Sequence, residues 1–98
     1  MIDVSFDNIE LESLMLDGKS TTYKEVVKKK GFLDSLRAFM SVLHILQNTK
    51  ELLLYKQFWY KQNVKASYVL INGSNIQRKL LFTEHELGTR IIINDLII

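Results

Sequence analysis

The sequence predicts an α+β domain in which helices pack on one face of a largely antiparallel sheet. Between residues 32 and 46, apolar residues recur at steps of three and four, which is the period of a helix with one buried face. From about residue 56 onward the period shifts towards two, and β-branched and aromatic residues become frequent, as they are in strands. Helices followed by a run of strands are typical of the α+β class.

The first expected element is a strand at residues 1–6 (MIDVSF), in which apolar and polar residues alternate. Asp7 and Glu10 have the spacing of a capping box, which predicts the start of a helix. Gly18 is placed to end that helix, because glycine readily adopts the left-handed conformation found at many helix C-termini. The Gly-Lys-Ser letters that begin at Gly18 resemble the end of a phosphate-binding loop. Ser13 stands where that motif needs glycine, so a helix stop followed by a polar loop explains them better.

Two further helical segments are expected before the strands. Thr22 and Glu25 repeat the capping-box spacing and begin a segment that runs through VVKKK until Gly31 breaks or kinks it. The long helix with the apolar stripe of residues 32–46 follows, and Asn48 begins the polar interruption that ends it. We expect this stripe to form part of the core.

Four strands are expected in the second half of the chain, with the letters KQFWYK, ASYVLI, IQRKLLFT and TRIIIND. The Asn-Gly pair at Asn72 is the expected turn between the second and third of them. The chain contains no proline, and neither a repeat nor a low-complexity linker divides it. Residues 1–98 are therefore expected to form a single domain.

The end of the chain is unusually apolar. Six isoleucine or leucine residues lie between Ile91 and Ile98, interrupted only by Asn94 and Asp95. An apolar strand on an open sheet edge promotes aggregation. We therefore expect a partner to cover part of it, either another protein or a second copy of this chain, which would form a homodimer. The alternative is that the helices of the chain itself bury both faces of the strand.

Composition excludes several classes of protein. The chain contains no cysteine, so it has no disulfide framework, thiolate metal site or thiol nucleophile. The fragment HEL at His85 lacks a second histidine four residues later, where Thr89 stands, so no zinc-protease pair is present. Neither a signal peptide nor an apolar stretch of membrane-spanning length is apparent. A cytoplasmic protein without a metal, a cofactor or a membrane span is expected.

Charge is unevenly distributed, although the formal net charge is only +2. Residues 1–22 carry five acidic residues and one lysine, whereas residues 23–65 carry nine basic and three acidic residues. A basic segment of this kind is typical of a surface that binds a polyanion, and a solvated helix face is the alternative. Its densest part is the run of Lys28, Lys29 and Lys30 between two expected helices.

Aromatic residues are interleaved with lysines in the same basic segment. Lysines hold phosphates, and aromatic rings stack on unpaired bases, so this mixture favours RNA binding. Half-buried strands are also rich in aromatic residues, which is the competing explanation. Beyond the lysine run, the candidate RNA-binding residues are Trp59, Lys61 and Lys65.

Two long segments carry a family resemblance. The first is LESLMLDGKSTTYKEVVKKKGFLDSLRAFMSVLHIL, which is followed by a turn with KELL. The second is SYVLINGSNIQRKLLF. In their order they resemble the helical hairpin, the Ser-x-x-(Ile/Val)-Asn-Gly hairpin and the Arg-bearing strand of RelE/HigB-like toxins, which belong to type II toxin–antitoxin systems and are mRNA interferases. Together the two segments cover most of the chain.

The resemblance implies the toxin half of a toxin–antitoxin pair, a ribosome-dependent endoribonuclease that cleaves mRNA in the cytoplasm. In this chemistry a 2′-hydroxyl attacks the neighbouring phosphate, while cations stabilise the charge that develops on the phosphorane. The implied partners are a cognate antitoxin of the helix-turn-helix type, the ribosome and mRNA. No cofactor is implied.

The resemblance also implies catalytic roles for particular residues. Counting back from Phe82 places Lys79 in the arginine position of the family, whereas residue identity selects Arg78. We expect this cation pair to face the scissile phosphate. Lys56 is the nearest match to the family histidine in the strand after the helices, and Asp95 matches a position near the end of the last strand.

Two other functions remain open. The tyrosine or histidine that commonly follows the last strand in the family has no counterpart in NDLII. The first alternative is therefore a catalytically inactive RelE-fold module that binds protein or RNA. The second is a small RNA-binding domain unrelated to toxins. Growth arrest on expression, relieved by a co-expressed neighbouring gene, separates the toxin from both.

Overall fold

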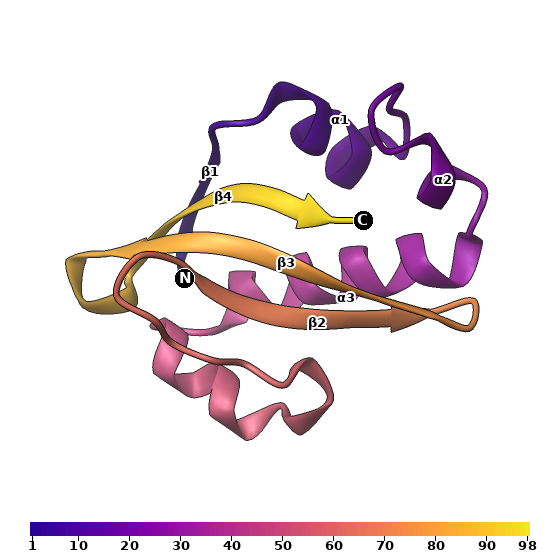
Figure 1. Ribbon diagram of the computed structural model, residues 1–98. Helices are drawn as coiled ribbons and strands as arrows, with labels where there is room; N and C mark the ends of the chain where they lie inside the picture. Colours follow the sequence, from indigo (N-terminus) through magenta and orange to yellow (C-terminus); the bar gives the residue numbers. More distant parts are fainter.

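A computed structural model describes all 98 residues. The elements in chain order are β1 (Asp3–Phe6), α1 (Ile9–Asp17), α2 (Lys24–Val27), α3 (Lys30–Ile45), the 3₁₀ helices η1 (Thr49–Leu54) and η2 (Lys56–Phe58), β2 (Ser67–Gly73), β3 (Ile76–His85), the 3₁₀ turn η3 (Glu86–Gly88) and β4 (Arg90–Ile97). The strands form one sheet in the order β1-β4-β3-β2 (Figure 1). β1 runs parallel to β4, and the other neighbours are antiparallel. The predicted α+β class is confirmed.

The core lies between the sheet and α3, which runs along one face of the sheet behind β2 and β3 in Figure 1. The side chains that α3 buries have the predicted helical spacing and are Phe32, Leu36, Phe39 and Leu43. Phe39 packs on Phe82 of β3, with ring centres 6.3 Å apart. Burial of each such side chain contributes about 1.5–3 kcal/mol to the free energy of folding.

No helix reaches the length and apolarity that a membrane span requires.

The opposite face of the sheet has no helix over it. Along β2, Val69 and Ile71 are buried against the helices, whereas Tyr68 and Leu70 between them are half-buried. This alternation follows from strand geometry, since successive side chains point to opposite faces. We call the side that carries Tyr68 and Leu70 the open face of the sheet.

The N-terminal helices begin differently from the prediction. Asn8, not Asp7, caps α1, and its side chain accepts a hydrogen bond from the Leu11 N–H at 3.1 Å. Gly18 ends α1 with φ 71°, as predicted. The segment after Thr22 is only the single turn α2, and Gly31 lies in the first turn of α3 instead of breaking a helix.

Glu10 organises the loop after α1 instead of completing a capping box. Its Oε1 accepts hydrogen bonds from the backbone N–H groups of Thr21 at 2.8 Å and Thr22 at 3.1 Å. The hydroxyls of Ser20 and Thr21 donate to the same oxygen at 2.9 Å. These donors, with the Thr22 N–H foremost, lower the pKa of Glu10 to about 2. The Gly-Lys-Ser loop is therefore fixed by a carboxylate, which is incompatible with a phosphate held there.

The tip of the β2–β3 hairpin packs against the beginning of α3. The turn lies at Ser74 and Asn75, both with positive φ, rather than at the predicted Asn-Gly pair. Ser74 Oγ accepts a hydrogen bond from the Gly31 N–H at 3.0 Å. A side chain at Gly73 would collide with the backbone of Gly31, so the glycine is required by this close approach and not by the turn.

The predicted strand at residues 56–61 is wrong. The chain forms η2 there, and the rings of Tyr55 and Phe58 lie 6.3 Å apart because a three-residue step returns to the same side of a 3₁₀ turn. Phe58 is buried against Phe39, with ring centres 5.2 Å apart. Only Lys61 joins the sheet, through an isolated antiparallel bridge to Tyr68.

β4 lies inside the sheet, yet its end is exposed. β1 pairs with it only as far as Ile93, so the outer edge beyond that residue has no strand neighbour. Ile97 and Ile98 remain 44% and 52% exposed. The alternative in which the helices of the chain bury both faces of this strand is therefore wrong.

Candidate nucleic-acid interface

Three side chains form a cluster on the open face, which we call the open-face cluster (Lys61, Tyr68 and Lys79). The Lys79 ammonium lies 4.3 Å from the centre of the Tyr68 ring. Lys61 and Tyr68 exchange backbone hydrogen bonds of 2.9 and 3.0 Å, and residues paired in this way point to the same face. Neither lysine forms an ion pair. The cluster therefore presents two unneutralised cations beside an aromatic ring.

Arg78 points to the opposite face from Lys79. It pairs with the buried Ile71, and its Nη1 donates to the Gln77 carbonyl at 2.9 Å. Its Nε is buried and has no hydrogen-bond partner. Because neighbours in a strand alternate, the expectation that both cations face one phosphate is wrong.

Asp95 is held by a hydroxyl from a distant part of the chain. The Tyr23 hydroxyl donates to Asp95 Oδ1 at 2.6 Å, and Asn8 Nδ2 donates to the Tyr23 oxygen at 2.8 Å. Burial, followed by the hydrogen bond to Asp95, raises the pKa of Tyr23. Asp95 pairs with Leu81, which is two residues from Lys79 along β3. Asp95 thus lies beside the open-face cluster, with Oδ1 already bound.

Lys56 and Trp59 lie together in a different place. Both are exposed, and both line an apolar cavity between η1 and η2. Lys65 is exposed in the loop between η2 and β2. The structure therefore divides the predicted catalytic residues among several surfaces and brings only Lys79 and Asp95 to neighbouring positions of paired strands.

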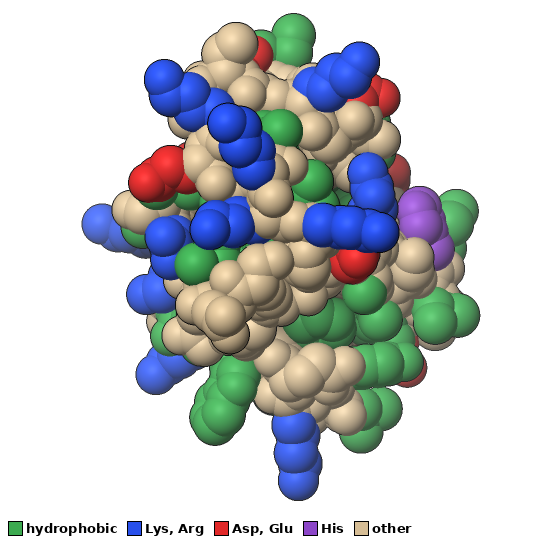
Figure 2. All heavy atoms as spheres, turned by 90° about the vertical axis from the view of Figure 1, so that its right-hand side faces the viewer, with side chains coloured by type: hydrophobic (Ala, Val, Ile, Leu, Met, Phe, Trp, Pro, Cys, Tyr) green, Lys and Arg blue, Asp and Glu red, His purple; other side chains and the backbone are tan.

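The lysine run lies at the end of the molecule formed by α2, the start of α3 and the hairpin tip. Figure 2 shows Lys and Arg side chains spread over this end. Lys28, Lys29 and Lys30 are all exposed, and Lys29 is the N-cap of α3 without a capping side chain. Cations at a helix N-terminus interact unfavourably with the helix dipole, and each lowers the stability of the helix by about 0.3–1 kcal/mol. The lysine run therefore presents three exposed cations at this end of the molecule.

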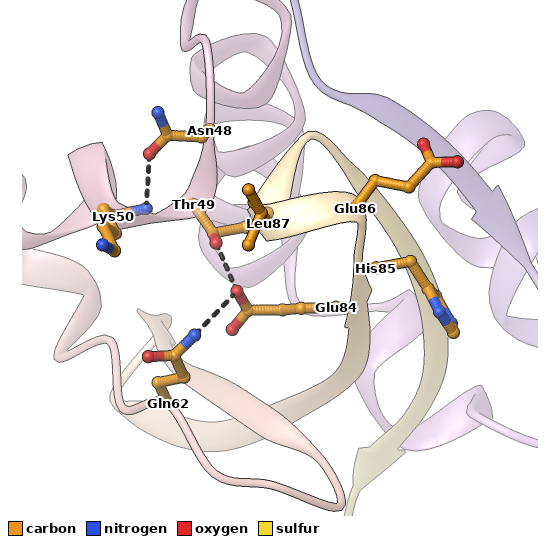
Figure 3. Close-up of a pocket in the computed structure, with 9 residues that line it drawn as sticks. Asn48, Thr49, Lys50, Gln62, Glu84, His85, Glu86 and Leu87 are labelled. Carbon is orange, nitrogen blue, oxygen red and sulfur yellow. Dashed lines mark hydrogen bonds between the residues drawn. The ribbon is translucent and has the colours of Figure 1, made fainter.

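A polar cavity of about 380 Å³ lies among η1, β3 and η3 (Figure 3). Glu84 points into it towards Thr49 and Gln62. Its Oε1 accepts hydrogen bonds from the Thr49 hydroxyl and from Gln62 Nε2, the latter at 3.4 Å. Its Oε2 accepts from the Tyr60 hydroxyl at 2.5 Å and from the Ser67 hydroxyl. With four donors around it, this carboxylate anchors η1 and the loop between η2 and β2 to the sheet.

Tyr60 completes the anchor from the other side. Its ring stacks on Phe82 with centres 6.1 Å apart and planes 11° apart. Burial first, and then the hydrogen bond to Glu84, raises the pKa of Tyr60 to about 12. Sequence reasoning did not select Glu84. Its partners come from η1, β2 and the loop between η2 and β2, and contacts between such distant segments leave no local pattern in the sequence.

Comparison of the chain with protein-family models, with curated proteins and with solved structures finds no match.

Proposed function

We propose that this protein is a ribosome-dependent endoribonuclease of the RelE/HigB type, the toxin of a toxin–antitoxin pair. The observation that carries the proposal is the position of Lys79, which is unpaired on the open face and stacked on Tyr68. Lys79 is also the residue that counting back from Phe82 assigns to the arginine of the resembling family. Arg78, the other candidate, is directed towards the helices.

The open-face cluster suits cleavage by an internal nucleophile. The 2′-hydroxyl oxygen bonds to the adjacent phosphorus as its proton leaves, and the bond from phosphorus to the 5′-oxygen breaks as that oxygen takes up a proton. The products are a 2′,3′-cyclic phosphate and a 5′-hydroxyl. Lys79 would stabilise the charge on the phosphorane, a contribution of about 10²–10³ in rate for one positioned donor. Asp95 Oδ2 makes no hydrogen bond and is the proposed proton acceptor.

The partners follow from two other surfaces. The lysine run at residues 28–30 would bind ribosomal RNA through phosphate contacts. The exposed Ile97 and Ile98, next to the unpaired edge of β4, would be covered by a segment of the cognate antitoxin or by a second copy of the chain. Sedimentation of the isolated chain measures its oligomeric state and so decides between these two partners. A chain that remains soluble as a monomer excludes the second copy.

A non-catalytic RNA-binding module of the same fold is the second candidate. Arg78 and Lys79 point to opposite faces of the sheet, so only one cation of β3 is left for the phosphate, which favours this candidate. The hydrogen bond that already occupies Asp95 Oδ1 favours it as well. Such a module would bind ribosomes or RNA and leave the RNA intact.

Primer-extension mapping of mRNA on translating ribosomes tests both candidates. The wild-type chain should produce new 5′-ends within codons in the ribosomal A site, and Lys79→Ala should not. Lys50→Ala is the matched control, because Lys50 is an exposed lysine of η1 beside the polar cavity. Ribosome binding without cleavage would favour the second candidate, and absence of both would refute the two together.

A further inference from the structure

An apolar cavity of about 340 Å³ opens between η1 and η2 and takes no part in the chemistry proposed above. Its lining residues are Leu52, Leu53, Tyr55, Lys56, Trp59 and Tyr60. Three of these six are aromatic and one is charged. The volume lies near the lower end of the range of about 300–1,000 Å³ that small-molecule sites occupy.

Trp59 is held at this cavity in an unfavourable conformation. Its φ of 48° and ψ of 44° lie in the left-handed region, which costs a bulky residue about 1–3 kcal/mol. Its side chain is nevertheless 67% exposed, so burial does not offset this cost. The Trp59 N–H donates to the Lys56 carbonyl at 3.1 Å, a bond that does not itself require a positive φ, since Tyr55 makes the equivalent bond to the Leu52 carbonyl with φ −106°. Folding alone gives no reason for a strained and exposed tryptophan at this position.

Two of the side chains that line the cavity with Trp59 are held in place. Leu52 is fully buried and forms the floor. Tyr60 is fixed by its stacking on Phe82 and by its hydrogen bond to Glu84. A site whose walls are already fixed loses little entropy when a ligand binds.

Charge selects the ligand. Lys56 is exposed and forms no ion pair, and no acidic residue lines the cavity. An apolar helix of a partner protein would desolvate the Lys56 ammonium without giving it a partner, which is unfavourable. A flat aromatic ligand that carries a negative charge satisfies both the rings and the cation. A nucleobase with its phosphate has these properties, and base–aromatic stacking is the usual way in which proteins bind unpaired bases.

We propose that this cavity binds one unpaired nucleobase of an RNA strand, with the base stacked on Trp59 and the phosphate on Lys56. The inference deepens the proposed function by naming a base-binding site, and it rests on that function for the choice of RNA. Lys61 follows Trp59 by two residues and is bridged to Tyr68. A strand that leaves the cavity would therefore pass Lys61 and reach Lys79.

Trp59 supplies the readout, because it is the single tryptophan of the chain. We expect adenosine 5′-monophosphate to quench its fluorescence saturably, and a short adenosine oligonucleotide to do so at lower concentration. The fluorescence anisotropy of a labelled oligonucleotide then measures how tightly each variant binds it. Trp59→Ala should weaken binding by about 5- to 150-fold, the effect of losing one stacked base. Trp59→Phe keeps a ring and should lose less, and circular dichroism checks that both variants fold.

Two controls separate this site from the proposed cleavage. Lys56→Gln should weaken binding of the monophosphate and leave adenosine unaffected, because adenosine has no phosphate. Lys79→Ala should lose cleavage and keep the quench by adenosine 5′-monophosphate, so that failure of the cleavage assay leaves this inference standing. Absence of a saturable quench by either nucleotide probe would overturn it. A quench by an apolar helical peptide and not by nucleotides would also overturn it and assign the cavity to a protein.

Discussion

The ammonium group of Lys79 lies 4.3 Å from the centre of the Tyr68 ring, on the face of the sheet that no helix covers (Figure 1). The attraction between a cation and an aromatic ring contributes about 0.5–1 kcal/mol of interaction free energy at an exposed site. It also favours one direction of this flexible side chain over the others. The open face therefore carries a cation that is both unneutralised and positioned.

We expect Lys79→Ala to lower the rate of mRNA cleavage by about 10²–10³, because one positioned donor to the phosphorane is removed. Arg78→Ala should leave the rate within a few-fold of wild type, because this side chain is directed to the helix face. Single-turnover cleavage on stalled ribosomes measures both rates. Equal losses in the two variants, or an undiminished rate in the double variant, would contradict the role of Lys79.

Glu84→Gln should lower the free energy of unfolding by about 1–3 kcal/mol, because an amide cannot accept from all four donors that surround this carboxylate. Urea denaturation measures the change. Glu25→Gln is the matched control, since Glu25 is exposed on α2. An unchanged urea midpoint for Glu84→Gln would show that the network does not stabilise the fold.

Alkaline pH should weaken the same network. The folded-state pKa of Tyr60 is raised from 10.0 to about 12. The stabilisation that this represents is fully present below pH 10 and is lost as the pH rises towards 12, because the unfolded chain releases the proton first. We expect the urea midpoint of the wild type to fall more steeply across this window than that of Tyr60→Phe, which cannot ionise there. Parallel profiles would argue against a raised pKa.

Gly73→Ala should destabilise the protein by about 1–3 kcal/mol, because the added methyl group would collide with the backbone of Gly31. Gly31→Ala is the informative comparison. Its methyl group would meet the Ser74 hydroxyl at 2.9 Å and the Ser74 backbone N at 3.1 Å, which are longer approaches than those at Gly73. The hydroxyl can rotate away only by giving up its hydrogen bond from the Gly31 N–H. Alanine is also favoured over glycine within a helix by about 1 kcal/mol. In thermal unfolding, the melting temperature of Gly73→Ala should therefore lie well below that of Gly31→Ala.

Replacement of Lys28, Lys29 and Lys30 by alanine should weaken ribosome binding and flatten its dependence on salt. The logarithm of the affinity falls as the logarithm of the salt concentration rises, and each lost phosphate contact makes this negative slope shallower by about 0.7–0.9. The same variant should unfold no more easily than wild type, since the three cations oppose the dipole of α3. An unchanged salt slope would show that the lysine run is only a solvated surface.

Periodicity predicted the elements whose side chains repeat locally. The apolar stripe of α3 and the alternation along β3 are both present in the sequence, and both are confirmed. The segment at residues 56–61 was misread because Tyr55 and Phe58 are spaced for a 3₁₀ turn, whereas the surrounding composition is typical of strands. Local composition does not distinguish these two conformations over six residues.

The candidate site was less predictable because it depends on register. Lys79 was selected from the sequence, but its contact with Tyr68 follows from a turn at Ser74 and Asn75. Placing that turn at Asn72 pairs the two strands differently. The hydrogen bond from Tyr23 to Asp95 is still harder to foresee, because it joins residues 72 positions apart through side chains alone.

The parallel pairing of β1 with β4 affects the order in which the protein folds. Asp3 lies opposite Arg90, and Phe6 lies opposite Ile93. A chain is synthesised at about 5–20 residues per second, and contacts between distant segments form late in folding. β1 therefore has no strand neighbour until β4 has been synthesised. The sheet that carries Lys79 would therefore remain incomplete until β4 has been synthesised and has left the ribosome.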